Sequence, residues 1–456
     1  MSDSSIPSMQ VTNETLSGWG NIPKSNSNVL IPTSIVEVAE CCSSGTQISR
    51  GLGRSYADQA TNQGGLVIKT EKLNEILSFD DSEGILSCGA GLSLDEIIRR
   101  FAPMGWFPMI TPGTKYVTVG GAIANDVHGK AHHVDGSFIN CVVDMQVMLA
   151  NGQVVSASRI ENSDLFFGSF GGLGLLGIIL SARIKLRKIE TTWFVQKPFP
   201  ARNLEEMLDA IDACDRDYAY SVAWIDSTAI GRNLGRGVLT AGNHAKIDDL
   251  PKKLQAKRLM VSNPPKISVP FYLPNFALNG VTVKILNKAL HIVQKSGKNL
   301  THYESFFYPL DAIGNWNRGY GKRGFIQYQF VIPEQDGRKN IRNILTEITQ
   351  SGCVPFLNVL KKFGDGSQML SFPKKGYTFA IDFPVTSRLQ AFTRRLDKIV
   401  LEAGGRIYLG KDAYLDADTF RAMYPEYKAW LEVKRKYDPD NVFSSDISRR
   451  LKLSDM

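Results

Sequence analysis

Residues 29–190 combine short apolar runs with glycine-rich turns. The runs are rich in branched aliphatic side chains and end at Gly, Asn, Asp or Ser, a pattern that predicts short β-strands. In Ser93-Leu94-Asp95-Glu96, Ser93 is a suitable helix N-cap and Glu96 follows three residues later, as in a capping box. The predicted strands are 47–49, 65–69, 84–88, 142–149 and 178–186.

From about residue 191 the pattern changes, and helices alternate with strands. Helices are predicted at 203–213, 338–350 and 388–403, and strands at 325–332 and 377–383. Beyond Gly405 the chain is rich in charges and partly helical.

The length of 456 residues fits two or three domains, at roughly 150 residues per domain. The change in pattern divides the chain into residues 1–190, 191–404 and 405–456. We predict an α+β fold with three parts: a first domain built from two subdomains, a second α+β domain whose antiparallel sheet covers a pocket, and a C-terminal segment that returns to the first domain.

Composition places the chain among soluble proteins, with 43% hydrophobic and 21% charged residues. The N-terminus lacks the basic start and apolar core of a signal peptide. The most apolar stretch, Leu173 to Ala182, is much shorter than the roughly 20 residues that span a bilayer. Six scattered cysteines show no metal-ligand spacing, so we expect reduced thiols, no metal site and a cytoplasmic protein.

The net charge of +8 is concentrated between Lys246 and Leu300. Ten basic residues there face only Asp248 and Asp249, and apolar side chains such as Phe271, Tyr272 and Phe276 lie between them. This composition suits an anionic membrane surface, which would place the protein on the inner face of the membrane. The alternative is an ordinary solvated loop with its apolar residues tucked into a domain. No recognition motif accompanies the charge, so we expect no nucleic-acid partner. The basic residues are Lys246, Lys252, Lys253, Lys257, Arg258, Lys266, Lys284, Lys288, Lys295 and Lys298.

A GxGxxG pattern at 172–177 is the first candidate for a nucleotide site. In a dinucleotide-binding fold this motif precedes a helix, whose N-terminus meets the pyrophosphate. Here the continuation through Ile184 and Leu186 alternates like a strand. A Rossmann fold is therefore not predicted.

Two other glycine-rich loops fit a phosphate and a flat ring better. In Ser49-Arg50-Gly51-Leu52-Gly53-Arg54-Ser55, backbone N–H groups can converge on phosphate oxygens without bulky side chains in the way. The second loop runs from Thr111 to Ser137, and its small residues leave space for a ring system.

Together the loops resemble the flavin domain of the vanillyl-alcohol-oxidase superfamily, which implies FAD. Covalent members carry a histidine in the first loop, where this chain has Arg54, so the resemblance implies a non-covalent flavin. The cofactor-binding residues that it implies are Ser49, Arg50, Gly51, Leu52, Gly53, Arg54, Ser55, Tyr56, Ala57, Asp58, Gly113, Thr114, Thr118, Val119, Gly120, Gly121, Asn125, Asp126, Val127, His128, Ile179 and Tyr408.

Longer segments narrow the resemblance to the decaprenylphosphoryl-β-D-ribose oxidase family. It implies oxidation of the ribose 2′-hydroxyl of a polyprenyl-phosphate sugar to a ketone, followed by reduction through a separate NAD(P)H-dependent short-chain reductase. A same-superfamily alternative is a soluble alditol or aldonolactone oxidase, and a different class is a flavin-free binding protein. The segments are 53–56, 126–130, 316–320, 327–331, 357–361 and 406–412.

The resemblance also implies the reacting residues. Lys411 matches an active-site lysine, and its ammonium can bind sugar oxygens or assist proton transfer. His128 can accept a proton or orient the hydroxyl, and the alternative is a histidine packed beneath the ring. Tyr56 and Tyr320 resemble pocket tyrosines.

The predicted strand 325–332 carries Gln327 and Gln329 two residues apart, so both amides face the same side. We expect a polar pocket wall that Lys361 joins and Trp224 helps to line. Mycobacterial family members have a cysteine and an asparagine where this chain has Ala380 and Thr378, which leaves the pocket shape and the exact sugar open.

Overall fold

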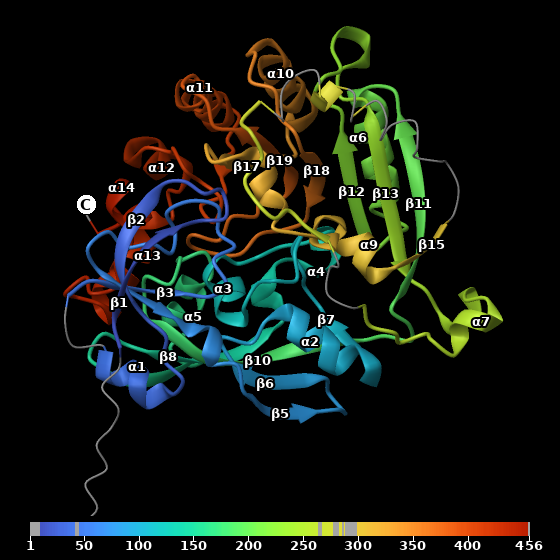
Figure 1. Cartoon of the computed structure of the whole chain (residues 1–456). Helices are drawn as coiled ribbons and strands as arrows, with labels where there is room; N and C mark the ends of the chain where they lie inside the picture. The colour runs from blue at the N-terminus through green and yellow to red at the C-terminus, as the bar shows by residue number, and fades with distance from the viewer. Residues whose placement is uncertain are drawn as a thin grey trace, which may run out of the picture.

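The computed structural model describes residues 10–41, 45–262, 267–276, 282–284, 287 and 299–454. Figure 1 shows two parts: a lower one built mainly from the N-terminal residues and an upper one dominated by a large sheet. The C-terminal helices, drawn in red, lie beside the blue N-terminal strands.

The lower part contains two sheets. The four-stranded sheet has the order β1 (Thr12–Ser17), β2 (Lys24–Leu30), β4 (Leu66–Lys69), β3 (Gln47–Arg50), in which β4 runs parallel to both β2 and β3. The main path of the second sheet is β5 (Ile76–Asp80), β6 (Ile85–Gly89), β10 (Ile178–Lys188), β8 (Val142–Met148) and β9 (Val154–Ser158), and β7 (Trp106–Pro108) also pairs with β10. The strands predicted for this half are confirmed.

The helices of this part are short, and they include α1 (Ile35–Cys41), α3 (Val119–Ala124), α4 (His132–Asp135) and α5 (Ser163–Ser169). The predicted capping box is present at α2 (Leu94–Phe101), where Ser93 accepts from the Glu96 backbone and Glu96 accepts from that of Ser93. The GxGxxG segment leads directly into β10, so the rejection of a Rossmann fold is confirmed.

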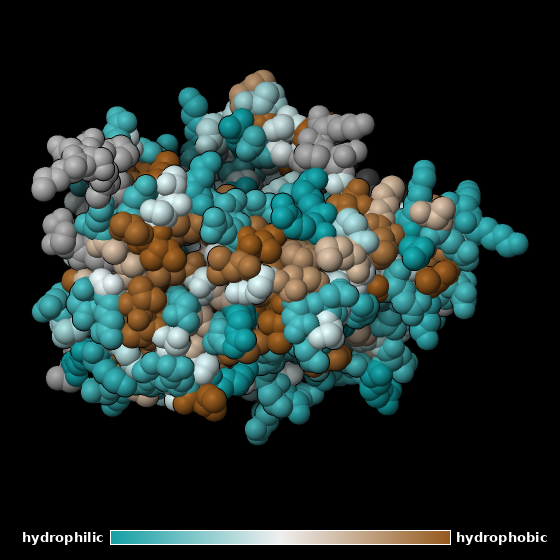
Figure 2. All heavy atoms as spheres, turned by 90° about the horizontal axis from the view of Figure 1, so that it is seen from below, coloured by the Kyte–Doolittle hydropathy of each residue, from teal (hydrophilic) through white to brown (hydrophobic). Residues whose placement is uncertain are grey.

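Figure 2 shows the lower part from below, with apolar side chains in a broken band among hydrophilic ones. Exposed apolar residues include Ile35 and Val36 on α1, Leu77 on β5 and Val154 on β9. Among the described residues, none of the helices combines the length and apolar content that crossing a membrane requires.

An eight-stranded sheet forms the upper part. Its order is β15 (Asn299–His302), β11 (Trp193–Ala201), β13 (Gly237–His244), β12 (Tyr220–Ile225), β18 (Asn358–Phe363), β19 (Gly376–Pro384), β17 (Phe325–Pro333) and β20 (Arg406–Ile407). All these neighbours pair antiparallel, as predicted for the second domain.

One face of this sheet is covered by α6 (Leu204–Cys214), α10 (Gly337–Gln350) and α11 (Leu389–Glu402). These three helices match the predicted ones. The central strands β17 and β19 are buried along almost their whole length, because helices cover one face and the glycine-rich loops approach the other. Polar side chains on the second face therefore lie inside the protein.

The C-terminal segment joins both parts. It enters the upper sheet as β20 and continues through α12 (Ala417–Met423), α13 (Tyr427–Tyr437) and α14 (Asp446–Arg450). The Gln47 N–H donates to the Val442 carbonyl at 2.8 Å, and α13 contacts α5. The segment thus contacts the lower part, while the exact domain boundaries stay a prediction.

Candidate active site

Two neighbouring cavities lie between the glycine-rich loops and the upper sheet. The narrower one, of about 120 Å³, follows residues 50–55 and the start of α3. The wider one, of about 360 Å³, extends from the second loop to β17, β18 and β19. Because five residues line both cavities, they form one elongated space. The shared residues are Arg54, Pro112, Thr114, Val127 and Tyr408.

The sheet wall of the wide cavity has the predicted polar character. Gln327, Gln329, Lys361 and Ala380 all line it, since adjacent strands place them on one face. Burial lowers the pKa of Lys361 to about 8, so this side chain is mostly protonated and charged at neutral pH. The wall therefore combines amide groups with a cation.

Lys411 reaches this wall from the segment after β20. Its Nζ donates to the Gln327 side-chain oxygen, and it lies 5.4 Å from the centre of the Tyr56 ring and 5.9 Å from that of Tyr408. Burial lowers the pKa of Lys411 to about 7; the charge of Lys361 acts in the same direction and Asp382 opposes it. At neutral pH the amine can therefore either hold or release a proton.

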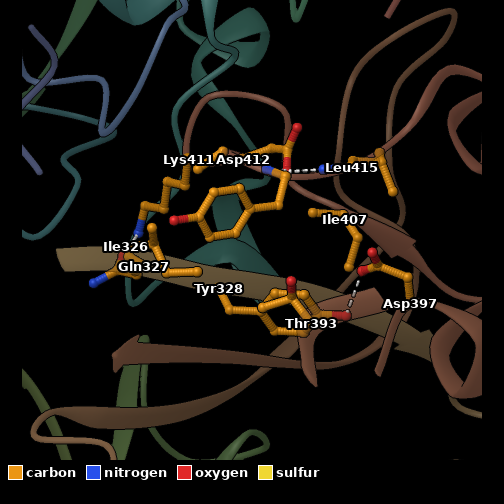
Figure 3. A pocket seen from close by; sticks show the side chains of 11 residues that line it. Ile326, Gln327, Tyr328, Thr393, Asp397, Ile407, Lys411, Asp412 and Leu415 are labelled. Carbon is orange, nitrogen blue, oxygen red and sulfur yellow. Dashed lines mark hydrogen bonds between the residues drawn. The ribbon is translucent and has the colours of Figure 1, made fainter. Parts of the chain in front are cut away.

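The turn after Lys411 is fixed by Asp412. Its Oδ1 accepts from the Tyr414 and Leu415 N–H groups at 3.0 Å each, and its Oδ2 accepts from Arg450 at 2.8 Å. Figure 3 shows Lys411 and Gln327 pointing toward each other above a small cavity of about 10 Å³. Short-range polar contacts thus hold Lys411 in place.

His128 lies in the same cavity but is paired. Its Nε2 is 2.9 Å from the side-chain nitrogen of Gln329, which also donates to the Thr378 hydroxyl at 3.1 Å. Burial holds the pKa of His128 well below its usual range, so the ring is neutral, and Nε2 accepts from the amide. The lone pair that a base needs is already engaged, which favours an orienting role.

Comparisons with known proteins agree with this geometry. A family model for an FAD binding domain matches residues 28–158, and one for D-arabinono-1,4-lactone oxidase matches residues 377–451. Decaprenylphosphoryl-β-D-ribose oxidase of Mycolicibacterium smegmatis is 41% identical over 97% of this chain and 98% of its own length. The chain belongs to the decaprenylphosphoryl-β-D-ribose oxidase family. L-gulono-1,4-lactone dehydrogenase of Mycobacterium tuberculosis is more distant, at 21% identity over 95% of this chain and 98% of its own.

As a member of this oxidase family the protein uses FAD, and the loops fit that cofactor. A Cβ atom on Gly51 would stand 2.2 Å from the Thr118 hydroxyl oxygen, so only glycine lets the two loops approach this closely. A Cβ on Gly113 would meet no atom within 4 Å, because this backbone faces open space in the wide cavity. The narrow cavity suits a pyrophosphate, and the wide one suits the flavin ring and a sugar.

Arg54 is the residue that the resemblance predicts to stand where covalent members of the superfamily carry the linking histidine. It donates to the Leu52 carbonyl at 2.5 Å, and its guanidinium carbon lies 4.4 Å from the centre of the Trp19 ring. The side chain lines both cavities. Its position is consistent with a non-covalent flavin, since a guanidinium cannot form the histidyl bond.

Several residues expected to bind FAD lie outside both cavities, and two of them hold the loops. Asp58 pairs with Arg450, and Asp126 accepts from Ser137 at 2.8 Å and from the Ile139 N–H at 3.1 Å. Cofactor contact by this group stays a prediction. Its members are Ser49, Ala57, Asp58, Val119, Gly120, Asp126 and Ile179.

Three residues expected to bind substrate do not line the cavity. Tyr320 stacks on Phe325 at 4.0 Å between ring centres, and its hydroxyl donates to Asp382. Thr378 is fully buried and donates to the Phe330 carbonyl at 2.9 Å. Trp224 lies further along the sheet, in register with Val359, a residue that does line the cavity. The first two contact side chains of the wall region without reaching the cavity.

Sequence reasoning missed several lining residues, including Trp19, Tyr116 and Asp311. Trp19 follows β1, and Asp311 comes from the segment 309–312, where no motif pointed to a pocket. Asp382, which contacts Gln327 without lining the cavity, was also missed, although its place two residues after Ala380 puts it on the same face of β19.

Proposed function

We propose that this protein oxidises the 2′-hydroxyl of a polyprenyl-phosphoryl ribose to the 2′-ketone. The observation that carries the proposal is the identity of 41% over 97% of the chain to an enzyme named for its action on decaprenylphosphoryl-β-D-ribose. The cavity supports it, because Lys411, Lys361, Gln327 and Gln329 offer two ammonium groups and two amides to a polyol that carries a phosphate.

The reaction removes a hydride from C2′ and a proton from its hydroxyl. FAD, when bound, accepts the hydride. Lys411 is suited to the proton, since its pKa of about 7 lets it accept and release protons near neutral pH. Lys361 stays charged and can bind the phosphate or the sugar oxygens. Gln327 and Gln329 orient the sugar.

The 2′-ketone is the first half of an epimerisation. A second enzyme must return a hydride to the opposite face of C2′, and a separate NAD(P)H-dependent short-chain reductase is the proposed partner. The oxidase would also need an electron acceptor, because each oxidation of a hydroxyl to a ketone releases two electrons.

The lipid-linked substrate favours a position on an anionic membrane surface at the cytoplasmic side. Lys246, Lys252, Lys253, Lys257 and Arg258 are all exposed, the last four on or beside α7 (Lys252–Gln255). The remaining basic residues Lys266, Lys288, Lys295 and Lys298 lie outside the described residues, and Lys284 is exposed.

One strand of this segment pairs with residues that line the cavity. In β14 (Ile267–Ser268), Ile267 is in register with Ile313 of β16 (Ile313–Gly314), which lines the wide cavity. Phe271 is 64% exposed and Phe276 76% exposed. Apolar side chains next to a cavity rim suit the lipid tail of a substrate whose sugar enters the cavity.

The test is anaerobic reduction of the bound flavin, which is monitored through the loss of flavin absorbance. A short-chain polyprenylphosphoryl-β-D-ribose should bleach the flavin, and its 2′-deoxy analogue should not, because it lacks the hydroxyl that is oxidised. Free pentoses, alditols and L-gulono-1,4-lactone test the soluble-substrate alternative, to which the match over residues 377–451 points. Bleaching by a lactone but not by the lipid-linked sugar would replace the proposal with that alternative.

A further inference from the structure

Asp382 is a buried carboxyl group beside Gln327, on the same face of the sheet as the polar wall. It lies on β19 in register with Gln327 on β17, and it is fully buried. Its Oδ1 accepts from the Gln327 side-chain nitrogen at 2.5 Å, and its Oδ2 accepts from the Tyr320 hydroxyl at 3.3 Å. It does not line the wide cavity, so it cannot touch a substrate there.

These contacts fix the direction of the Gln327 amide. The amide nitrogen faces the carboxylate, and the amide oxygen therefore faces Lys411, whose Nζ donates to it. The reversed amide would place an oxygen against the carboxylate and an NH₂ group against the ammonium, and both contacts would be repulsive. The Asp382 carboxylate thus determines that Lys411 faces the oxygen of the Gln327 amide and not its NH₂ group.

We propose that Asp382 is a positioning residue that acts on Lys411 through Gln327: it keeps the amide oxygen directed at the Lys411 amine and supplies the negative charge behind it. The consequence for the reaction rests on the proposed function, whereas the effect on Lys411 itself does not. Tyr320, predicted to bind substrate, instead donates its hydroxyl to this carboxylate.

The charges around Lys411 support this assignment. Lys361 on β18 lowers the pKa of Lys411, and Asp382 raises it. The other titratable groups that face the amine are the phenols of Tyr56 and Tyr408, whose pKa values burial raises well above the usual range, and the neutral ring of His128. Among these groups only Asp382 can carry a negative charge near neutral pH.

The test measures the pKa of Lys411 in two ways: directly by NMR, and through the pH dependence of flavin reduction by substrate. Holoenzyme labelled with ¹³C at the lysine ε-carbon is titrated by NMR, and the Lys411→Arg spectrum assigns the signal. In Asp382→Asn the pKa of Lys411 should fall by about one pH unit, since an opposite charge close by is lost. The inflection that belongs to Lys411 in the pH profile of anaerobic flavin reduction should move to lower pH by the same amount.

Asp397 provides a matched control. It is a buried carboxyl on α11 that accepts from the Tyr328 hydroxyl at 2.8 Å, on the opposite face of β17. Burial raises its pKa to about 7, as it does for Asp382. Asp397→Asn therefore removes a comparable buried charge without touching Gln327, and it should leave the titration of Lys411 unchanged.

A second variant covers the case in which Asp382→Asn does not fold. Gln327→Met removes the amide that stabilises the ionised carboxylate, so it should shift Lys411 in the same direction. The double variant should shift it no further than either single one, because both changes break the same connection. An unchanged Lys411 pKa in a folded, FAD-containing variant would overturn the proposal. A shifted pKa in an enzyme whose flavin no ribose substrate bleaches would refute the proposed function alone.

Discussion

Asp58 in the first glycine-rich loop and Arg450 in the last helix form a two-point ion pair, with both N–O distances at 2.8 Å. The same guanidinium donates to Asp412 at 2.8 Å, one residue after Lys411. The C-terminal helix therefore connects the first glycine-rich loop to the turn that carries Lys411. No motif links these three positions in the sequence, and the pairing depends on the return of the C-terminal segment.

We predict that Arg450→Met lowers the free energy of unfolding by about 3 kcal/mol, because it leaves two buried carboxylates without their cation. Loss of FAD at a lower denaturant concentration should accompany it. Urea unfolding followed by fluorescence and by flavin release measures both. The control is Arg435→Met, whose partner is the largely exposed Glu432, and its effect should stay within about 0.5 kcal/mol. Equal stability of both variants would contradict the prediction.

The flavin should be non-covalent, because Arg54 stands where covalent relatives carry histidine. Precipitation with acid should leave the yellow colour in the supernatant, and the washed polypeptide should have the mass of the unmodified chain. Flavin that stays with the pellet after a wash in denaturant would show a linkage through another residue.

Lys411→Ala should retain FAD and lose sugar oxidation. The lysine lines the wide cavity and not the narrow one, so its removal leaves the narrow cavity, which suits the pyrophosphate, unchanged. Loss of a proton-transfer group costs on the order of 10²-fold or more in rate. Single-turnover flavin reduction measures the loss, and the flavin content of the purified variant is the control. A rate within a few-fold of the unchanged enzyme would remove Lys411 from the mechanism.

The repeating elements of the fold could be predicted from the sequence, since strand and helix signals are local. Gln327 and Gln329 were found in this way, because alternation along a strand assigns both to one face. Contacts between distant segments carry no local signal. Trp19 under Arg54 and Asp311 beside the second loop belong to this class, and they were missed.

Whether a predicted residue touches the cavity also depends on how its neighbours pack around it. Tyr320 and Thr378 are on the right strand or beside it, yet both are buried, and they contact Asp382 and Gln329 instead of the cavity. A sequence shows that a polar residue lies near a site, but not whether neighbouring side chains cover it. That distinction requires the register of the strands and the packing behind them.

Stability should fall in mild acid because three histidines are buried and neutral. Burial lowers the pKa of His132 and of His244 to about 3, and it also holds the pKa of His128 well below its usual range. Below about pH 6.5 the unfolded chain binds protons that the folded protein excludes. Protonation of each ring in the unfolded chain therefore lowers the free energy of unfolding by about 1 kcal/mol at pH 5.5. This loss is absent above pH 7.

Urea unfolding at pH 7.5 and pH 5.5 measures this difference. His244 packs on Phe194 at 4.2 Å between ring centres and lines neither cavity, so it can be changed without affecting the site. In His244→Phe the stability lost between the two pH values should shrink by about 1 kcal/mol. An identical pH dependence in the variant would show that His244 is already protonated in the folded protein.

The last prediction concerns the membrane. Lys252, Lys253 and Lys257 are exposed on or beside α7, and each charge near an anionic surface contributes about 1 kcal/mol. Reversing all three to glutamate should therefore weaken binding to anionic vesicles by 100-fold or more, on the order of the three contributions lost. Co-sedimentation with vesicles of anionic and of neutral lipid, at low and high salt, measures the binding, and salt should weaken it through screening.

The matched control reverses Lys339, Lys398 and Lys428, which are exposed on α10, α11 and α13, so that the net charge changes equally. An equal loss in both triple variants would indicate a general effect of net charge. Negligible binding of the unchanged protein in all four conditions would contradict membrane attachment and favour a soluble substrate.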